Sequence, residues 1–258
     1  MITSVNNPSV KNIIALQKKG KLRKEQAVFL VEGPKMVSEI PAGFLRELYV
    51  SEEVEASGQF DDLLKNKKYE LVNSKVFREM SDTQTPQGIL AVVSQQYSTL
   101  KDILKTIPSH LLLLEDIQDP GNLGTMLRAG EGAGITGIVM SKGCVDIYNP
   151  KVIRSTMGSV YRVPFVYTDD FYGTILEIKK SCKVYAAHLK GEYAYDKGDY
   201  TGNTAMIIGN EARGIREETA ALADTLIKIP MEGQVESLNA AVAASILMYE
   251  VYRQRRSR

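Results

Sequence analysis

The sequence predicts an α/β protein in two parts: a small α/β unit, then a larger and mainly parallel sheet with helices on both faces. Short apolar runs alternate with helical patterns along the 258 residues. After residue 110 the apolar runs become nearly continuous, which is typical of strands buried on both faces. The apolar content of 44% is sufficient for sizeable cores.

The first part alternates strand and helix patterns. Strands are predicted at 27–33, 46–52 and 88–94, and helices at 34–40, opened by Pro34, and at 74–81. A polar stretch follows at 95–110 and could form a short helix between two domains. We therefore expect a first domain at 1–97, a linker at 98–109 and a second domain at 110–258.

The second part repeats strand–helix units. Its predicted strands are 110–115, 135–140, 163–167, 183–189, 204–209 and 225–230. Its predicted helices are 122–133, 149–158 and 237–254. Ligands of parallel sheets bind beyond the carboxyl ends of the strands. The loops after 115, 209 and 230 are therefore the candidate site.

Composition argues against several protein classes. Two cysteines, Cys144 and Cys182, and two histidines, His110 and His188, make a zinc site or a disulfide framework improbable. The start, MITSVNNPSVKNI, lacks the pattern of a secretory signal, and no apolar run is long enough to span a bilayer. We expect a soluble, cytoplasmic protein without a metal.

Charge is nearly balanced, at +1 overall, but both ends are basic. The last residues, YRQRRSR, contain four arginines. Such ends are ordinarily solvated tails, although they also suit a polyanion such as RNA. Before Glu25 the basic residues are Lys11, Lys18, Lys19, Lys21, Arg23 and Lys24.

Two glycine patterns do not indicate nucleotide binding. Gly132, Gly134 and Gly137 match G-x-G-x-x-G, but they close a helix instead of opening one. A helix C-cap explains them better. The stretch GNEARGI at 209–215 has glycines spaced as in a P-loop but lacks the Lys-Ser/Thr pair. A nicotinamide enzyme and a nucleotide triphosphatase are both disfavoured.

The polar residues of these loops also have an ordinary structural explanation. Asn210, Glu211 and Arg213 could belong to a simple strand-to-helix turn. Ser237 could be the N-cap of the last helix. Considered together, however, the loops have the order and spacing of a known enzyme family.

The sequence resembles the SpoU (TrmH-type) family of RNA ribose 2′-O-methyltransferases, in the SPOUT superfamily. The matching stretches are LLLLEDIQDPGNLGTMLRAGEGAG, NPKVIRSTMGSVYRVPF, MIIGNEARGI and IKIPMEGQVESLNAAVAASILMYE. Through VFLVEG and SDTQTPQGILAVV, the first domain resembles the L30e-like substrate-binding module of this family. The resemblance implies a deep trefoil knot, S-adenosylmethionine as cofactor, and a homodimer.

The resemblance also implies roles for individual residues. Those matching the active site are Arg128, Asn122, Glu211, Ser237 and Asn239, and those around the cofactor are Gly209, Ile229, Met231 and Leu238. Candidate RNA contacts are Lys18, Lys19, Lys21, Arg23, Lys24 and Arg154, with a surface helix arginine as the alternative for Arg154.

Arg128 matches the arginine that has been proposed in the family as the base for the ribose proton. A guanidinium hardly ever loses its proton in a protein, so we expect electrostatic stabilisation of the alkoxide and orientation of a phosphate instead. Glu211 is expected to fix Arg128 or Asn122 by hydrogen bonding. Ser237 and Asn239 are expected to orient substrate or cofactor.

The expected activity is methylation of a ribose 2′-hydroxyl in structured RNA, with ribosomal RNA of the 23S type as the favoured substrate. A transfer RNA methyltransferase and a non-catalytic RNA-binding or ribosome-assembly protein are the alternatives. The presence of all five matching active-site residues favours catalysis. An apolar stripe on the last helix, Leu238, Val242, Ile246 and Tyr249, suits either the core or a dimer contact.

Overall fold

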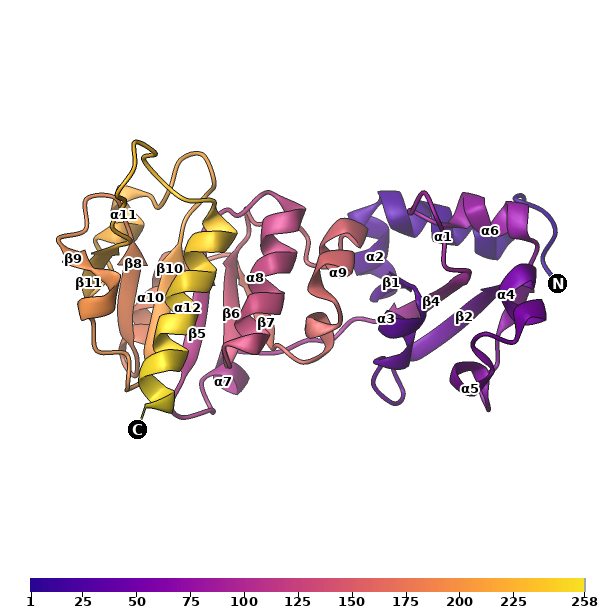
Figure 1. Cartoon of the computed structure of the whole chain (residues 1–258), viewed down its shortest axis with the longest axis horizontal. Helices are drawn as coiled ribbons and strands as arrows, with labels where there is room; N and C mark the ends of the chain where they lie inside the picture. The colour runs from indigo at the N-terminus through magenta and orange to yellow at the C-terminus, as the bar shows by residue number, and fades with distance from the viewer. Residues whose placement is uncertain (258) are drawn as a thin grey trace. The chain divides into compact units, whose positions relative to one another are not determined.

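The computed structural model describes residues 1–257 and confirms the α/β class (Figure 1). The chain divides into two compact units. The first comprises 1–96 together with 146–161, and the second comprises 97–145 and the chain from 162 onward. Within the described residues, no helix is long and apolar enough to cross a membrane.

The first unit contains a four-stranded mixed sheet. Its strands lie in the order β1-β4-β2-β3. β4 is antiparallel to β1 and to β2, whereas β3 is parallel to β2. Their bounds are β1 (Val28–Glu32), β2 (Leu45–Ser51), β3 (Glu70–Val72) and β4 (Ile89–Ser94).

Helices cover this sheet and include elements that the sequence patterns did not predict. The helices are α1 (Pro8–Lys18), α2 (Gly20–Gln26), α3 (Pro34–Ser38), α4 (Glu52–Ser57), α5 (Asp61–Leu64) and α6 (Ser74–Met80). In α1, Val10, Ile13 and Leu16 are fully buried. They share a core with Phe77 of α6 and Leu30 of β1.

A segment from later in the chain completes the first unit. Residues 146–161 contain α9 (Pro150–Thr156) and the 3₁₀ helix η1 (Ser159–Tyr161), and α9 packs against β1. The Tyr148 ring lies 4.7 Å from the Phe29 ring, between centroids. The Tyr148 hydroxyl donates to the Gln96 carbonyl at 2.9 Å, and the Tyr161 hydroxyl donates to the Met36 carbonyl at 3.1 Å. This segment is therefore part of the core of the first unit.

The second unit contains a seven-stranded sheet in which all paired strands are parallel, as the apolar runs predicted. The strand order is β7-β6-β5-β10-β8-β11-β9. The bounds are β5 (His110–Leu114), β6 (Gly137–Ser141), β7 (Phe165–Thr168), β8 (Lys183–Ala187), β9 (Tyr193–Ala194), β10 (Thr204–Ile208) and β11 (Thr225–Lys228).

Helices lie on both faces of this sheet. Figure 1 shows α8 (Pro120–Gly132) and α12 (Ala240–Arg256) in front of the strands and α10 (Phe171–Lys179) behind them. Leu111 and Leu113 of β5 share a core with Ile175 of α10. Shorter helices are α7 (Leu100–Ile103), η2 (Tyr195–Lys197) and α11 (Glu217–Ala220). Because the strands are parallel, the β5–α8, β10–α11 and β11–α12 loops leave from the same edge of the sheet.

Candidate active site

The β5–α8 loop ends in a capped helix that carries two predicted site residues. The Asp119 carboxylate caps α8 by accepting the Asn122 N–H at 2.8 Å, and Pro120 occupies the first turn. Along α8, Asn122 and the exposed Thr125 and Arg128 recur every three residues. Successive members of this series are neighbours on the helix surface, whereas Asn122 and Arg128 themselves lie roughly 120° apart around the helix axis.

The β10–α11 loop is a tight turn that depends on glycine. The Asn210 N–H donates to the Gly214 carbonyl at 3.0 Å, and the Gly214 N–H donates to the Asn210 carbonyl at 2.8 Å. A Cβ at Gly209 would lie 2.2 Å from the Gly214 carbonyl carbon, and Gly214 has a φ of +70°. The glycines therefore allow the turn that presents Glu211.

The Glu211 carboxylate joins this turn to the β5–α8 loop. It accepts hydrogen bonds from the Gln118 N–H at 3.1 Å, the Asp119 N–H at 3.0 Å and the Asn122 side-chain amide at 3.1 Å. Partial burial disfavours the charged carboxylate, but these donors outweigh it and lower the pKa of Glu211 below its ordinary value. Of the two partners expected for Glu211, the hydrogen bond goes to Asn122.

Asn239 brings the third loop into the same arrangement. Its Oδ1 caps α12 by accepting the Ala241 N–H at 2.9 Å and the Val242 N–H at 3.3 Å. Its Nδ2 donates to the Asn122 Oδ1 at 2.9 Å. Glu211, Asn122 and Asn239 thus form one hydrogen-bonded chain across three loops. The N-cap of α12 is Asn239, so the alternative explanation of Ser237 as the cap is wrong.

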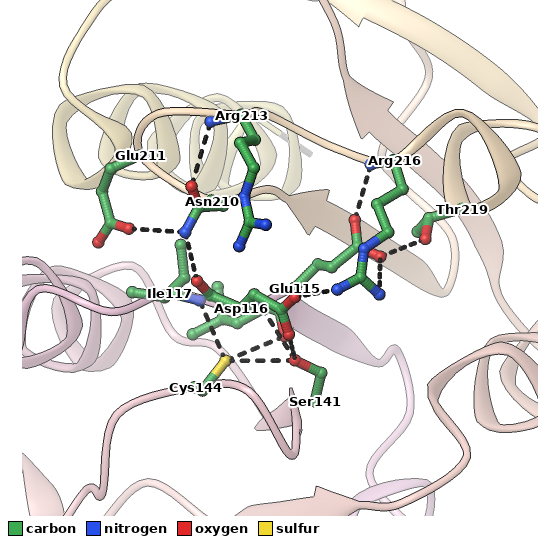
Figure 2. A network of polar contacts seen from close by, with 11 residues as sticks. Glu115, Asp116, Ile117, Ser141, Cys144, Asn210, Glu211, Arg213, Arg216 and Thr219 are labelled. Carbon is green, nitrogen blue, oxygen red and sulfur yellow. Dashed lines mark hydrogen bonds and ion pairs between the residues drawn. The ribbon is translucent and has the colours of Figure 1, made fainter.

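Asn210, next to Glu211 in the same turn, also connects this turn to the β5–α8 loop (Figure 2). Its side-chain amide donates to the Asp116 carbonyl at 2.7 Å. Its Oδ1 accepts the backbone N–H groups of Ala212 and Arg213 at 3.0 and 3.1 Å. The side chain therefore fixes its own turn and attaches it to the β5–α8 loop.

Three of the four residues expected around the cofactor lie in a segment without regular secondary structure. Residues 229–238 form neither helix nor strand, so their backbone amides and carbonyls are not committed to a ladder. Ile229, Met231 and Leu238 in this segment are half-buried, and Gly209 is buried. Half-buried apolar side chains with uncommitted backbone groups fit an adenosyl ligand. Ser237 and Arg128 are exposed.

The predicted RNA contacts fall into two groups. Lys18, Lys19, Lys21 and Lys24 are exposed, as phosphate contact requires. Arg23 is not, and its assignment to RNA needs correction. Its side chain is 4% exposed. It donates to Asp146 at 2.6 Å and to the Leu16 carbonyl at 2.6 Å, so it is a structural residue.

Arg154 lies on α9 and forms an ion pair with Asp82 of the same unit at 2.5 Å. Its side chain is 37% exposed. A phosphate could reach it, but its charge is already neutralised in part. Within residues 1–257 there is no group of three or more His, Cys, Asp or Glu side chains arranged to hold a metal ion.

Comparison with known proteins identifies the family. The model of the SpoU rRNA Methylase family matches residues 109–249, and that of the MRM3-like substrate binding domain matches residues 7–91. The chain belongs to the SpoU rRNA methylase family. It is therefore an RNA 2′-O-methyltransferase, as the sequence resemblance implied.

Individual relatives extend along nearly the whole chain. The 23S rRNA (guanosine(2553)-2′-O)-methyltransferase RlmP of Bacillus subtilis is 33% identical over 97% of this chain and 98% of its own. The AdoMet-bound rRNA methyltransferase of Sinorhizobium meliloti has a TM-score of 0.85 and 32% identity, covering 98% of this chain and 97% of its own. The SpoU methyltransferase AviRb of Streptomyces viridochromogenes, in complex with AdoMet, has a TM-score of 0.88 and 27% identity, covering 97% and 99%.

Proposed function

We propose that this protein transfers a methyl group from S-adenosylmethionine to a ribose 2′-hydroxyl of ribosomal RNA. The observation that carries the proposal is the hydrogen-bonded chain Glu211–Asn122–Asn239, which joins three loops at the carboxyl edge of the parallel sheet. The named activity of the Bacillus relative and the AdoMet held by the solved relatives support the same reaction.

S-adenosylmethionine, when bound, supplies an electrophilic methyl group on a sulfonium sulfur. We expect the 229–238 segment to hold its adenosyl part. The side chains of Ile229, Met231 and Leu238 would form the apolar wall, and backbone groups there and at Gly209 would provide the hydrogen bonds. The family's trefoil knot stays a prediction for this segment and its neighbours.

The protein's own side chains must activate and align the hydroxyl. A ribose hydroxyl is a weak nucleophile until its proton leaves, so the site must stabilise a developing alkoxide. Arg128 would act through its charge, on the alkoxide or the adjacent phosphate, while the ribose proton would pass to a water molecule and the sulfonium would leave as a neutral thioether. Asn122 is held on both sides, because its Nδ2 donates to Glu211 and its Oδ1 accepts from Asn239. The exposed Ser237 hydroxyl would orient substrate or cofactor.

Ribosomal RNA is the substrate we favour because the Bacillus relative, 33% identical over nearly the whole chain, is named for 23S rRNA. The exposed lysines of α1 and α2 and of the turn between them (Lys18, Lys19, Lys21 and Lys24) would contact phosphates of the folded RNA. Transfer RNA remains the alternative substrate, and the test below separates the two.

The test is transfer of labelled methyl from S-adenosylmethionine to ribosomal and transfer RNA purified separately from a strain that lacks the protein. Wild type should label one ribosomal RNA species. Arg128→Ala should lose about 100- to 1,000-fold in rate, because an electrostatic group at the reacting oxygen is removed. Lys180→Gln is the control, since its exposed pair with Glu177 lies at the C-terminal end of α10.

Each outcome has a clear meaning. If only transfer RNA becomes labelled, then transfer RNA is the substrate and ribosomal RNA is not. Tight RNA binding by wild type without any transfer, including to immature ribosomal particles from the same strain, would favour the non-catalytic alternative. An Arg128→Ala rate within threefold of wild type would remove Arg128 from the mechanism.

We also propose that the protein is a homodimer that uses the outer side of α12. Val242, Tyr249 and Tyr252 recur along this helix and are 47%, 47% and 38% exposed. Their stripe is apolar, whereas the opposite side of α12 is buried in the core.

Light scattering after size exclusion tests the dimer. Wild type should have twice the mass of one chain, and Tyr249→Arg should have the mass of one chain. Tyr97→Arg, exposed outside the stripe, should remain dimeric. A wild-type monomer at micromolar concentration would contradict the proposal.

A further inference from the structure

Two acidic residues at the end of β5, Glu115 and Asp116, have no role in the chemistry above. Glu115 is 1% exposed and Asp116 is 9% exposed. Carboxylates buried to this extent require hydrogen-bond partners or a compensating charge. The side-chain partners of this acidic pair come from the end of β6 (Ser141) and from the start of α11 (Arg216 and Thr219), as Figure 2 shows.

Glu115 is held by the start of α11. One carboxylate oxygen accepts the Arg216 backbone N–H at 2.9 Å. The other accepts the Thr219 hydroxyl and lies 3.7 Å from the Arg216 guanidinium. Glu115 therefore fixes both the backbone and the side chain of Arg216.

Asp116 is held from two directions. The Arg216 guanidinium donates to one carboxylate oxygen, and the Ser141 hydroxyl donates to the other at 2.7 Å. The Asp116 backbone N–H donates in turn to the Ser141 Oγ at 2.9 Å. Its φ of +54° lies in the left-handed region, which residues other than glycine adopt uncommonly.

Arg216 thus connects the β10–α11 segment to the root of the β5–α8 loop. Three residues beyond Asp116 is Asp119, the N-cap of α8, and Asn122 follows in the first turn. Farther out, Glu211 connects the same two segments through Asp119 and Asn122. The loop before α8 is therefore attached at its base by Arg216 and at its tip by Glu211.

We propose that Arg216 is a positioning residue for methyl transfer. By holding Glu115 and Asp116, it sets where α8 begins and hence where Asn122 and Arg128 meet the substrate. The inference rests on the proposed function for its catalytic consequence. The attachment itself can be measured independently of activity.

The experiment compares Arg216→Gln and Arg216→Lys with wild type and with the Lys180→Gln control. In Arg216→Gln, kcat should fall about 10- to 100-fold, because small displacements of catalytic groups have effects of this size. The Kd for S-adenosylmethionine should stay within about threefold, because the 210–214 turn is closed by its own backbone hydrogen bonds. Arg216→Lys should recover part of the rate, since it keeps the charge but not the two-pronged geometry.

A double variant separates positioning from an independent contribution. Because part of the effect of Arg216 passes through Asn122, Arg216→Gln combined with Asn122→Ala should lose less than the product of the two single losses. Fully multiplicative losses would overturn the proposal, and so would an unchanged kcat in Arg216→Gln. If Arg216→Gln does not fold, as judged by circular dichroism, Asp116→Asn takes its place, because it removes the charge at nearly constant shape.

Hydrogen exchange provides the readout that does not depend on catalysis. In Arg216→Gln, the peptide that spans residues 115–125 should exchange about tenfold faster, while peptides from α1 in the first unit should not change. Faster exchange with an inactive wild type would mean that the proposed function fails and the attachment stands. An active wild type with unchanged exchange and unchanged kcat in the variant would mean that only the positioning role fails.

Discussion

The two ends of β5 both contain a buried ionisable side chain, but they use it differently. His110 at the amino end and Glu115 after the carboxyl end are each 1% exposed. The partners of Glu115 are Arg216, the N-cap of α11, and the hydroxyl of Thr219 within α11. Near His110 the charged neighbour is Arg255, which has the same sign as a protonated imidazole. A buried charge at the carboxyl end connects loops, whereas the buried histidine at the amino end must stay neutral.

The amino end is organised for stability. Burial, with a further contribution from the positive charge of Arg255, lowers the pKa of His110 to about 3. The Arg255 guanidinium donates to the Ser109 carbonyl and to the Gly202 carbonyl, both at 2.7 Å. These contacts attach the end of α12 to the loops before β5 and β10. They lie at the opposite end of the strands from Asn122.

The largest effect that sharpens this comparison is expected from Glu211→Ala. The variant loses the acceptor for two backbone N–H groups and for the Asn122 amide, so Asn122 is no longer held on that side. The methyl-transfer rate should fall about 100-fold. The unfolding temperature should move by only a few degrees, because the freed groups are at the surface and can bond to water. Glu217→Ala, on the exposed start of α11, is the matched control. Equal rates for the two variants would contradict the assignment.

A smaller effect, on stability alone, is expected from His110→Phe. In wild type the folded pKa of about 3 lies below the ordinary 6.5, so between these values only the unfolded state binds the proton. Stability is therefore lost as pH falls below 6.5, by about 2 kcal/mol at pH 5 relative to pH 7.5. In urea unfolding, the free energy of unfolding of His110→Phe should fall by about 2 kcal/mol less than that of wild type over this pH range. Its methyl transfer at pH 7.5 should be unchanged. His188→Gln should behave like wild type, and an equal pH dependence in all three proteins would refute the neutral buried histidine.

The sequence was sufficient for the parallel sheet because its strands are continuous apolar runs such as Leu111–Leu114. It was insufficient for the first helices. There the lysines dominate the pattern and obscure the apolar residues Val10, Ile13 and Leu16, which are buried in α1. Arg23 shows the same limit, because a basic stretch does not reveal that one of its members turns inward to Asp146, more than a hundred residues away.

In the candidate site, too, some residues could be predicted from the sequence and others could not. Asn122, Glu211 and Asn239 could be selected by family resemblance, and the structure brings them together. Arg216 could not be selected from the sequence. Its partners Glu115 and Asp116 come close to it only when β5 pairs with β10. In the sequence, two acidic residues directly after a buried strand indicate that a basic or hydrogen-bonding partner is needed. They do not indicate that this partner is Arg216.

The segment 146–161 has a practical consequence for any attempt to separate the two units. The chain passes from one unit to the other at 96/97, 145/146 and 161/162. A fragment that stops at Gln96 would leave behind α9 and the Tyr148 ring that covers Phe29, and so would uncover an aromatic side chain that is 1% exposed. We expect such a fragment to aggregate. Limited proteolysis within 98–109 should nick the protein without releasing the first unit.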